Sequence, residues 1–444
     1  MQTQPRLRCL MLAVPITMAC GQPGPDDTAG ADASSGPATT HGSTHGGTRG
    51  SEDDPGDEGS EGDGTGGSDG ALDTTDGDGA SSDGGPSDPA AWLPPIGIPA
   101  PEFGIVETAE ACAACEVITT SDVAALEDIP PGTIVELEGG PHIGSALTIS
   151  GNGTADAPVF VRSKDPAQPV VLTYDVEISG SYLIVEHLDF DQGLRDQSVG
   201  VSGDHIAVRH SSVHAFRPGH FSTALHVSNA EHVVLWDNEI HDNGDFAVAG
   251  EHDVHGIGGS NMHRLWIVDS HLHHNRGDSM QFGHQAGNSL GDIYVGRNHI
   301  HDDGENCVDI KEASNVVVSE NELHDPGGGV AVVFHDCPVN ASAIYNEIYD
   351  SPVGLSLPSL EDACGPHLPV ELFVTRNDIS SVTTGIEGWG SGKRYFVAGN
   401  AFAGGDSAIE IDNEGPGSIL SPDDTDIDAV FAAFEAVYGI AIDG

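Results

Sequence analysis

One short phrase repeats from about residue 180 to residue 405, and this repeat constrains the fold more than any other feature of the chain. Each copy has an apolar strand, a polar turn and a second strand. The turns centre on Asn238, Ser270, Asn298, Asn321, Asn346, Asn377 and Asn400, at spacings of 32, 28, 23, 25, 31 and 23 residues. A period of this length, built from strands rather than helices, is typical of a β-solenoid.

Apolar and polar residues alternate within the copies, as at Ile293 and Val295 or at Val316 and Val318. Alternation at period 2 indicates strands with one buried face. One coil cannot bury this face by itself, but stacked coils share a continuous core. Stacking also places each turn Asn above its equivalent at about 4.8 Å, where the amides can form a ladder. We therefore predict an all-β fold, a right-handed parallel β-helix, in which these Asn residues are structural.

The folded part of the chain is strongly acidic. The formal net charge of the 444 residues is -55, and residues 101–444 contain 54 acidic and 12 basic residues, a net of -42. Such a field disfavours nucleic acid, which needs a basic surface. It favours solubility, cation binding and neutral or metal-bridged partners. General surface acidity suited to a salty habitat explains the charge equally well.

Residues 1–20 resemble the signal peptide of a bacterial lipoprotein. Arg6 and Arg8 precede an apolar run that ends at Ala19 and Cys20, and this run is too short to span a bilayer. The pattern predicts lipidation of Cys20, with ordinary signal cleavage as the alternative. Gly21 after the Cys points to the outer membrane or cell surface. No later segment is a transmembrane candidate, so the lipid anchor is the only membrane contact we expect.

The rest of the chain divides by composition into four parts. Residues 21–91 contain almost no bulky apolar residue, so we expect a disordered acidic linker that holds the folded domain off a membrane. Residues 92–130 are expected to form an N-terminal cap, and residues 131–415 the coils. Residues 416–444 are expected to form a loop and a capping helix. We expect the protein to be a monomer.

Both ends of the coil region carry helix signals. Ser121 or Asp122 can N-cap a short helix in the N-terminal part. Near the C-terminus, Val430, Phe434 and Val437 fall on one helical face. We expect this second helix to cover the open edge of the last coil, since exposed strand edges favour aggregation.

Export favours disulfides among the cysteines outside the signal segment. Cys337 and Cys364 are 27 residues apart, about one coil, so we predict that they stack as neighbours and form a bridge. Cys112 and Cys115 can close a small loop by a disulfide, with a redox role as the other interpretation. Cys307 is then left as a free thiol.

A column of histidines follows the ladder at an offset of three residues. Its members are His214, His241, His273, His301 and His324, followed by Tyr349, and the next residue is acidic at Asp242, Asp302, Asp325 and Asp350. Stacked coils place such imidazoles about 5 Å apart, and His with carboxylate at that spacing can bind a divalent metal. The interpretation we favour is a solvated turn whose His and Asp side chains hydrogen-bond to the backbone.

The strand after each turn carries the candidate site. Aligning the coils places Gln281, Asp309, Lys311 and Glu387 outward, with Asp278 and Glu305 at the mouths of their strands and Arg276 and His284 close by. We interpret Gln281, His284 and Glu387 as substrate-binding candidates. Lys311 stands out because the chain has only three lysines. The alternative to a catalytic role is a surface lysine paired with Asp309 or Glu312.

Three phrases near the start of the coils resemble a known family. They are Pro131-Gly-Thr-Ile-Val-Glu-Leu, Gly153-Thr-Ala-Asp-Ala-Pro-Val-Phe-Val-Arg and Tyr182-Leu-Ile-Val-Glu-His-Leu-Asp-Phe. They are similar to the entry of right-handed parallel β-helix proteins, including polysaccharide lyases of the alginate lyase and chondroitinase B type. The resemblance covers roughly residues 121–415. It is specific for the fold and weaker for activity, because this fold hosts many functions.

The phrase Glu305-Asn-Cys-Val-Asp-Ile-Lys is similar to the catalytic phrase of that family. The resemblance implies that Lys311 is the base, and that Glu305 or Asp309, with Asp278, binds a Ca²⁺ ion on the uronate carboxylate. Ca²⁺ takes oxygen ligands, and a cation on the carboxylate acidifies the neighbouring carbon. The acidic residues stand at other offsets from Lys311 than in the family.

The catalytic Arg of the family is replaced in this sequence. Val333-Phe334-His335 stands where that Arg would fall. Either His335 takes its place or Arg276 or Arg297 supplies it from a neighbouring coil, and the alternative is that the catalytic machinery is absent. We thus predict a surface-tethered protein that acts on polysaccharide, most concretely a Ca²⁺-dependent lyase of uronic-acid glycans. The alternative is a non-catalytic glycan-binding or adhesion module.

Overall fold

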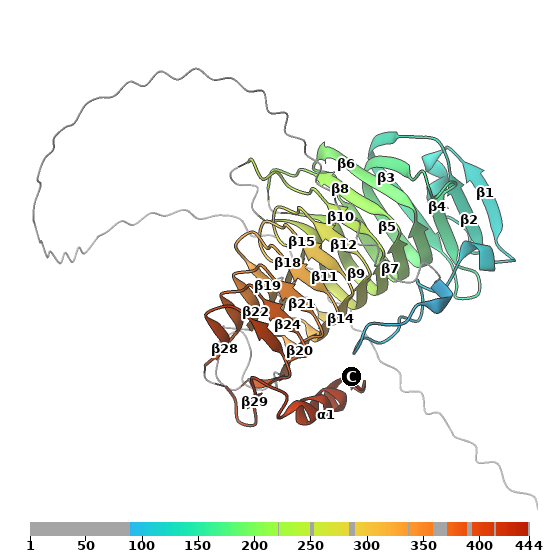
Figure 1. Cartoon of the computed structure of the whole chain (residues 1–444). Coiled ribbons are helices and arrows are strands. Elements are labelled where there is room, and N and C mark those ends of the chain that lie inside the picture. Colours follow the sequence, from blue (N-terminus) through green and yellow to red (C-terminus); the bar gives the residue numbers. More distant parts are fainter. Residues whose placement is uncertain are drawn as a thin grey trace, which may run out of the picture. The chain divides into compact units, whose positions relative to one another are not determined.

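The structure is a computed structural model that describes residues 89–220, 222–248, 253–283, 289–335, 338–357, 371–388, 393–412 and 414–442. Within these residues the chain forms a parallel β-helix (Figure 1), in which each coil pairs in parallel with the next. The predicted fold class is therefore confirmed. The predicted signal segment with Cys20 lies outside the described residues, as do residues 21–88 of the predicted linker.

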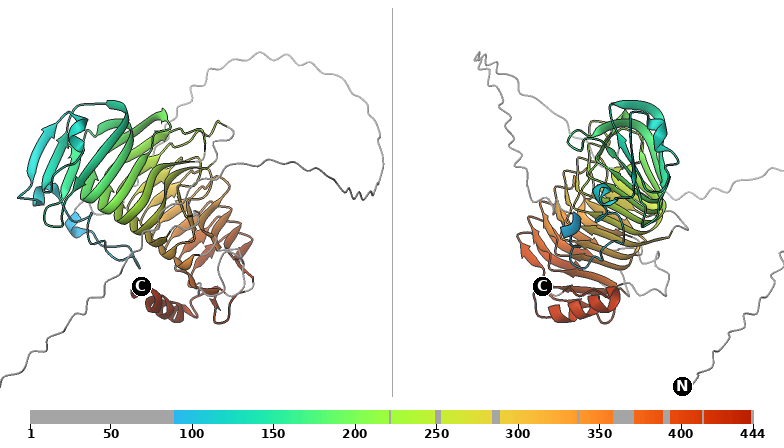
Figure 2. Two further views of the ribbon diagram at one scale, coloured as in Figure 1. Left: turned by 180° about the vertical axis from the view of Figure 1, so that it is seen from behind. Right: turned by 90° about the vertical axis from the view of Figure 1, so that its right-hand side faces the viewer.

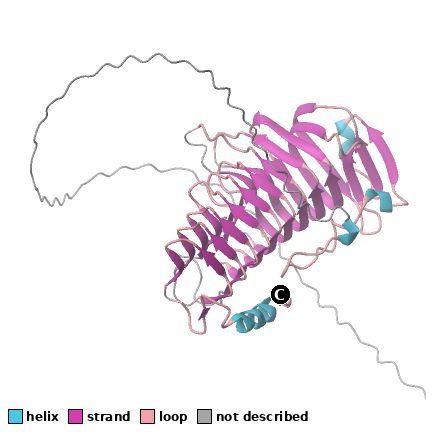
Figure 3. Ribbon diagram, in the orientation of Figure 1, coloured by secondary structure: helices cyan, strands magenta, loops and turns pink. Residues whose placement is uncertain are grey.

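The coils wind over three faces, each of which is a stack of parallel strands (Figure 3). The cavity face contains β3 (His142–Asn152), β13 (Met280–Phe282), β16 (Val308–Lys311), β19 (Val330–His335), β22 (Val353–Leu357), β25 (Thr384–Gly388) and β28 (Ser407–Ile411). The covered face contains β1 (Glu116–Thr120), β2 (Thr133–Leu137), β4 (Val159–Ser163), β14 (Leu290–Gly296), β17 (Ser314–Ser319), β20 (Val339–Ile344), β23 (Glu371–Thr375), β26 (Arg394–Ala398) and β29 (Ile419–Leu420).

The third face, which we call the histidine face, is made of short strands. It contains β6 (Leu188–Arg195), β8 (Ser212–Phe216), β10 (Glu239–His241), β12 (His271–His273), β15 (His299–His301), β18 (Glu322–His324), β21 (Glu347–Tyr349), β24 (Asp378–Ser380) and β27 (Ala401–Ala403). The coils therefore run from the cavity face to the covered face and then to the histidine face.

Four long strands cross from the cavity face to the covered face without a break, namely β5 (Val170–Glu186), β7 (Val199–Arg209), β9 (Ser222–Trp236) and β11 (Val254–Val268). Stacked glycines allow the first of these bends. Gly180 and Gly203 pair in register and have φ of 131° and 123°. A Cβ at Gly203 would lie 2.2 Å from the carbonyl oxygen of Gly180. Glycine is needed here both for its backbone angles and for the close approach.

The predicted Asn ladder forms at the bend between the covered face and the histidine face. Oδ1 of Asn321 accepts hydrogen bonds from the backbone N–H and from Nδ2 of Asn298, both at 2.9 Å. Asn346 does the same for Asn321, and the pattern continues through Asn377 to Asn400. The ladder satisfies backbone and side-chain groups that the solenoid buries, so its role is structural as predicted.

The covered face has an outward apolar column. Its members include Ile134, Phe160, Ile184, Ala207, Val234, Trp266, Val317, Phe373 and Phe396, all of them buried. They belong to a second hydrophobic cluster, separate from the core inside the coils. Two segments cover this column: residues 92–111 and helix α1 (Ile427–Tyr438). Figure 2 shows both segments beside the coils.

Residues 92–111 run along the covered face and include the 3₁₀ helix η2 (Ala109–Ala111); η1 (Pro89–Ala91) precedes them. Trp92 donates from Nε1 to Asp269 at 2.6 Å. The guanidinium of Arg209, 2% exposed, pairs with Glu186 and donates to the carbonyls of Gly104, Ile105 and Glu107. Because a buried Arg needs several partners, this contact fixes the segment on the coils.

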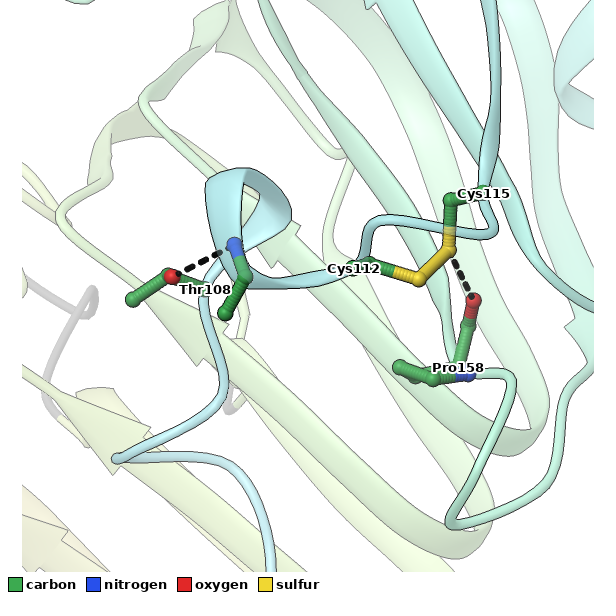
Figure 4. Close-up of a disulfide and its surroundings, with 5 residues drawn as sticks. Thr108, Cys112, Cys115 and Pro158 are labelled. Atoms are coloured by element: carbon green, nitrogen blue, oxygen red, sulfur yellow. Dashed lines mark hydrogen bonds between the residues drawn. A yellow bond between two sulfur atoms is a disulfide. The ribbon is translucent and has the colours of Figure 1, made fainter.

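A disulfide joins Cys112 and Cys115 directly after this segment (Figure 4). Sγ of Cys115 lies 3.9 Å from the carbonyl oxygen of Pro158. The short helix expected next is η3 (Val123–Leu126), a 3₁₀ helix whose N-cap is Asp122. Cys307 is a buried free thiol. The predicted partners Cys337 and Cys364 lie outside the described residues.

Helix α1 corrects one expectation. Val430 and Phe434 are fully buried, as the helical face predicted. However, α1 does not pack as a lid on the open edge of the last coil. It contacts β23 and β26 on the covered face, and Tyr438 donates to the carbonyls of Val316 and Asn340. No helix in the described part of the chain has the length and apolarity that crossing a membrane requires.

Candidate functional site

The candidate site on the cavity face is built around Asp309 of β16. Asp309 is 2% exposed although it occupies an outward strand position. Nζ of Lys311 lies 3.1 Å from its Oδ2, and Nδ1 of His335 lies 3.0 Å from its Oδ1. The contact between His335 and Oδ1 of Asp309 is within ion-pair distance, but it does not have the geometry of a hydrogen bond. The side chains of Lys311 and His335, from two neighbouring coils, therefore meet at one buried carboxylate.

Strand register explains why Lys311 and His335 share this carboxylate. Lys311 of β16 pairs directly with His335 of β19, and both point outward. Their side chains are 20% and 43% exposed, so solvent or a ligand can reach them. The sequence placed His335 one coil after Lys311, and the structure brings the two together.

Asp278 lies behind Asp309 and is fully buried. Its Oδ1 accepts from the backbone N–H and from Nδ2 of Asn306, at 2.9 and 2.8 Å, and its Oδ2 accepts from Gln281 at 2.7 Å. Burial, and then the charge of Asp309, raise the pKa of Asp278 to about 7. Gln281 is therefore a bridge between the two aspartates, since its Nε2 also lies 3.5 Å from Asp309.

His255 completes the buried side of this cluster, and the sequence analysis did not find it. It is 1% exposed, and its Nδ1 accepts from the backbone N–H of Asp278 at 3.0 Å. Burial lowers the pKa of His255 to about 4, so the ring is neutral at pH 7. Its signal in the sequence was its position one coil before Asp278, two residues ahead of the strand pair Ile257 and Met280.

Glu305 lies at the mouth of β16, next to Asp253. Burial first, and then the charge and hydrogen bond of Asp253, raise the pKa of Glu305. The three expected calcium ligands do not form one cage: Asp278 gives its oxygens to protein donors, and Asp309 contacts Lys311 and His335. The donor set that fits a Ca²⁺ ion better is the carboxyl pair of Asp253 and Glu305, because a cation can replace the proton that such a pair shares.

Other predicted residues lie apart from Asp309. Arg276 stacks its guanidinium over Phe246, 5.2 Å from the ring centre, and Phe246 is 51% exposed. Glu387 lies in the same outward column, but three coils further on, and accepts from Ser356 at 2.9 Å. Arg297 is on the covered face, paired with Asp269 and stacked on Trp92, so it cannot serve Lys311. His284 lies outside the described residues.

A cavity of about 500 Å³ opens on the same face, several coils before Lys311. Its lining is rich in hydroxyl and small side chains: Thr148, Ser198, Gly200, Ser222, Thr223 and Ser228, with Glu177 and His226. Glu177, Gly200 and His226 are successive members of the outward column that leads to Asp309. A Cβ at Gly200 would lie 2.5 Å from a carboxylate oxygen of Glu177, so this glycine makes room for that side chain. The sequence analysis missed this cavity.

The histidine face carries the predicted column. Rings of His214, His241, His273, His301 and His324 stack at centroid distances of 4.9, 5.1, 5.3 and 4.9 Å. The following acids bond to these rings rather than to the backbone: Nδ1 of His301 lies 2.7 Å from Asp302, and Nδ1 of His324 lies 2.8 Å from Asp325. The predicted stacking distance of about 5 Å is therefore confirmed.

No family model matches the sequence, and the search of curated proteins found no match. Similar solved structures include the A-module of a mannuronan C-5 epimerase of Azotobacter vinelandii (15% identity, 65% of this chain and 81% of that chain covered, TM-score 0.46). They also include an alginate lyase from Paenibacillus sp. (15%, 67% and 99%, 0.43) and a surface adhesin of Streptococcus pneumoniae (10%, 65% and 86%, 0.35). These likenesses are too distant to carry an argument about activity.

Proposed function

We propose that this protein binds a polysaccharide along the cavity face and acts on it at the cluster of Asp309, Lys311 and His335. The observation that carries the proposal is that an ammonium and an imidazole, both reachable from solvent, share one buried carboxylate. Groups that can exchange or stabilise protons, held by a buried acid in register along a strand face, are typical of catalytic sites.

The reaction we propose is removal of the proton on C5, next to the carboxylate of a uronic-acid residue, followed by cleavage of the bond between C4 and the glycosidic oxygen. A C4–C5 double bond forms, and the departing oxygen takes up a proton from water. Asp309 stabilises the ammonium form of Lys311, so this residue suits a role as the cation that neutralises the substrate carboxylate and the charge developing beside it. His335 suits the role of proton acceptor, since an imidazole is an effective base near neutral pH. This assignment gives the role of base to His335, whereas the family resemblance implies that Lys311 is the base.

Calcium remains part of the proposal, at the carboxyl pair of Asp253 and Glu305. A divalent cation at this pair would supply charge that attracts a polyuronate to an acidic protein. The residues of the chain orient the sugar: Gln281 is fixed between two aspartates, and Phe246 offers an exposed ring on which a sugar can pack.

The test is the absorbance of the unsaturated uronate product over a panel of acidic glycans, with and without Ca²⁺. We expect activity on at least one glycan, and a loss of at least 100-fold in Lys311→Ala and in His335→Ala, the scale of a lost acid–base or charge-stabilising group. Lys164→Ala is the matched control, because Lys164 is a half-exposed lysine paired with Glu138 far from the site. Activity that survives in both site variants would reject the assignment.

A second candidate function is glycan binding without cleavage, and the cavity near Glu177 and His226 favours it. Hydroxyl-rich linings suit sugar recognition through hydrogen bonds. In this case Lys311→Ala would still bind the glycan, and His226→Ala would weaken binding. The absorbance of an unsaturated uronate product would not appear with any variant. Glycan-array binding of the two variants separates the candidates.

We further propose that Cys20 carries a lipid that tethers the coils to the outer membrane or cell surface. The support is the sequence alone, namely the signal-like residues 1–20 and the linker composition. Cys20→Ser is expected to abolish metabolic labelling with a radioactive fatty acid and to release the protein from the membrane fraction. Unchanged labelling of this variant would refute the anchor.

A further inference from the structure

The histidine face has two outward columns, not one. From β10 to β27 its strands are three residues long, and their middle residues, such as Leu272 and Ile300, are fully buried. The first and third residues therefore point outward. The first column reads Ser212, Glu239, His271, His299, Glu322 and Glu347, and the third column is the stacked series from His214 to Tyr349.

Side chains of the two columns meet diagonally across neighbouring coils. Nε2 of His271 lies 2.8 Å from Nε2 of His301, and Nε2 of His299 lies 3.0 Å from Nε2 of His324. These nitrogen pairs are slightly closer than two ligands of one zinc ion, which sit roughly 3.3 Å apart when each bond is about 2.0 Å and the geometry is tetrahedral.

Three groups of potential ligands result, in each of which the ligand atoms lie within 4.8 Å of one another. The first group is Glu239, His271 and His273; the middle group is His271, His299 and His301; the last group is His299, Glu322 and His324. Each supplies three nitrogen or carboxylate ligands and leaves room for water as a fourth, the arrangement of an open zinc site.

The acids after the third column set the orientation of the rings. Asp302 and Asp325 accept from Nδ1 of His301 and His324. A proton on Nδ1 leaves the lone pair on Nε2, and this nitrogen faces the neighbouring column. Carboxylates behind metal-bound imidazoles fix the tautomer in this way in known metal sites. The Asp residues are thus partners of the ligands rather than ligands.

The protonation states agree with this geometry. Burial and the adjacent imidazoles lower the pKa of His271 and of His299 to about 4, so both rings are neutral at pH 7. The hydrogen bond with His273 lowers the pKa of Glu239 to about 2. Metal ions need ligands in these deprotonated forms.

We propose that the histidine face binds first-row transition-metal ions, with Zn²⁺ as the reference ion. Because His271 belongs to the first and middle groups and His299 to the middle and last groups, each ring serves one ion at a time. The face therefore holds two ions, in the first and last groups, about 10 Å apart at two coil spacings. Imidazole ligands favour Zn²⁺ over Ca²⁺, which takes oxygen ligands.

The experiment is calorimetric titration of the full chain, without a histidine tag and after chelator treatment, with Zn²⁺ at pH 7.5. We expect the wild type to bind two more ions than the double variant His271→Ala/His299→Ala. His271→Ala leaves only the last group and His299→Ala only the first, so each single variant is expected to lose one ion. His263→Ala, which removes a histidine bonded to Ser289 away from this face, is the control and keeps both.

Two results would overturn the proposal. One is a double variant that binds as many Zn²⁺ ions as the wild type with equal affinity. The other is displacement of the bound Zn²⁺ by equimolar Ca²⁺. Far-ultraviolet circular dichroism checks that the variants fold. The pair His271→Gln/His299→Gln, which keeps side-chain size and hydrogen bonding, is expected to lose the same two ions and distinguishes lost ligands from lost structure.

Discussion

Asp278 is the residue whose protonation most affects the cavity-face cluster. It has no exposed surface, and its pKa of about 7 lies well above that of an ordinary aspartate. Near neutral pH it therefore exchanges between a neutral and a charged form next to Asp309. The negative charge near Lys311 and His335 therefore changes with the protonation of Asp278. Through this buried residue, pH can alter the electrostatics of the proposed site.

This leads to a prediction for Asp278→Asn. Between about pH 4 and pH 7 the folded protein keeps the Asp278 proton while the unfolded chain releases it, so this group costs stability as pH rises. The wild type should lose stability relative to Asp278→Asn by on the order of 4 kcal/mol over that interval, and the difference should stay constant above it. Denaturant unfolding at several pH values measures this, with exposed Asp156→Asn as the control. A difference that does not change with pH would contradict the raised pKa.

Sequence reasoning found some site residues and missed others for identifiable reasons. Asp309 and Lys311 were placed together because period 2 fixes the outward positions of a strand, and the family resemblance pointed to His335 one coil later. His255 was missed because the alignment of the coils began at strand residues such as Met280, and His255 lies two residues before the partner of Met280. The second column on the histidine face had a signal, the repeated tripeptides His271-Leu-His and His299-Ile-His, but only the third residue of each was followed.

Among the structural elements, the Asn ladder holds adjacent coils in register. Each amide accepts from the coil before it and donates to a backbone carbonyl; Nδ2 of Asn321, for example, donates to Val295. The ladder lies at a bend where the preceding residue, such as Arg297 or Glu320, has positive φ. The bend cannot pair all of its backbone groups by strand hydrogen bonds, and the amides replace the missing partners.

We predict that Asn321→Ala destabilises the protein by about 3 kcal/mol, because it leaves two buried donors of Asn298 and the carbonyl of Val295 without partners. Asn321→Ser should cost less, since Ser270 fills the equivalent position one coil earlier than Asn298. Exposed Asn152→Ala should change the free energy of unfolding by less than about 0.5 kcal/mol. Equal effects of Asn321→Ala and Asn152→Ala in urea unfolding would refute the ladder's role.

On the covered face, the sequence did not predict which segments pack against the strands. Runs such as Leu265-Trp266-Ile267 are apolar on both sides of the strand, and this indicates that something covers the outer side. The segments that do so, residues 92–111 and α1, lie more than a hundred residues away in sequence from many of their contacts. Local patterns contain no information on such a distant pairing.

At the scale of the whole molecule, the dominant property is negative charge. A net of -42 over residues 101–444 produces self-repulsion that opposes the folded state. Basic residues are therefore engaged in ion pairs. Arg162, for example, pairs with Glu110 and Glu136, and Arg209 pairs with Glu186. This balance also explains why both proposed ligand sites involve cations.

We predict that NaCl stabilises the protein. Raising the salt from about 10 mM to about 300 mM shortens the Debye length from roughly 30 Å to less than 10 Å, and it weakens repulsion between distant carboxylates more than it weakens the buried ion pairs. The midpoint of thermal unfolding should rise by a few degrees, equally in KCl. A midpoint that falls with salt would show that ion pairs outweigh the repulsion.

Both proposed sites depend on one claim, that neighbouring coils place equivalent side chains directly above one another. Glu347 and Asp378 are exposed and paired in register on the histidine face, whereas Ser380 is one outward position further along. The most direct measurement is disulfide formation in the double variants Glu347→Cys/Asp378→Cys and Glu347→Cys/Ser380→Cys, read by mass spectrometry after mild oxidation. In-register strands lie within disulfide reach and offset positions do not. The account predicts a bridge in the first variant alone, and a bridge in the second but not the first would contradict it.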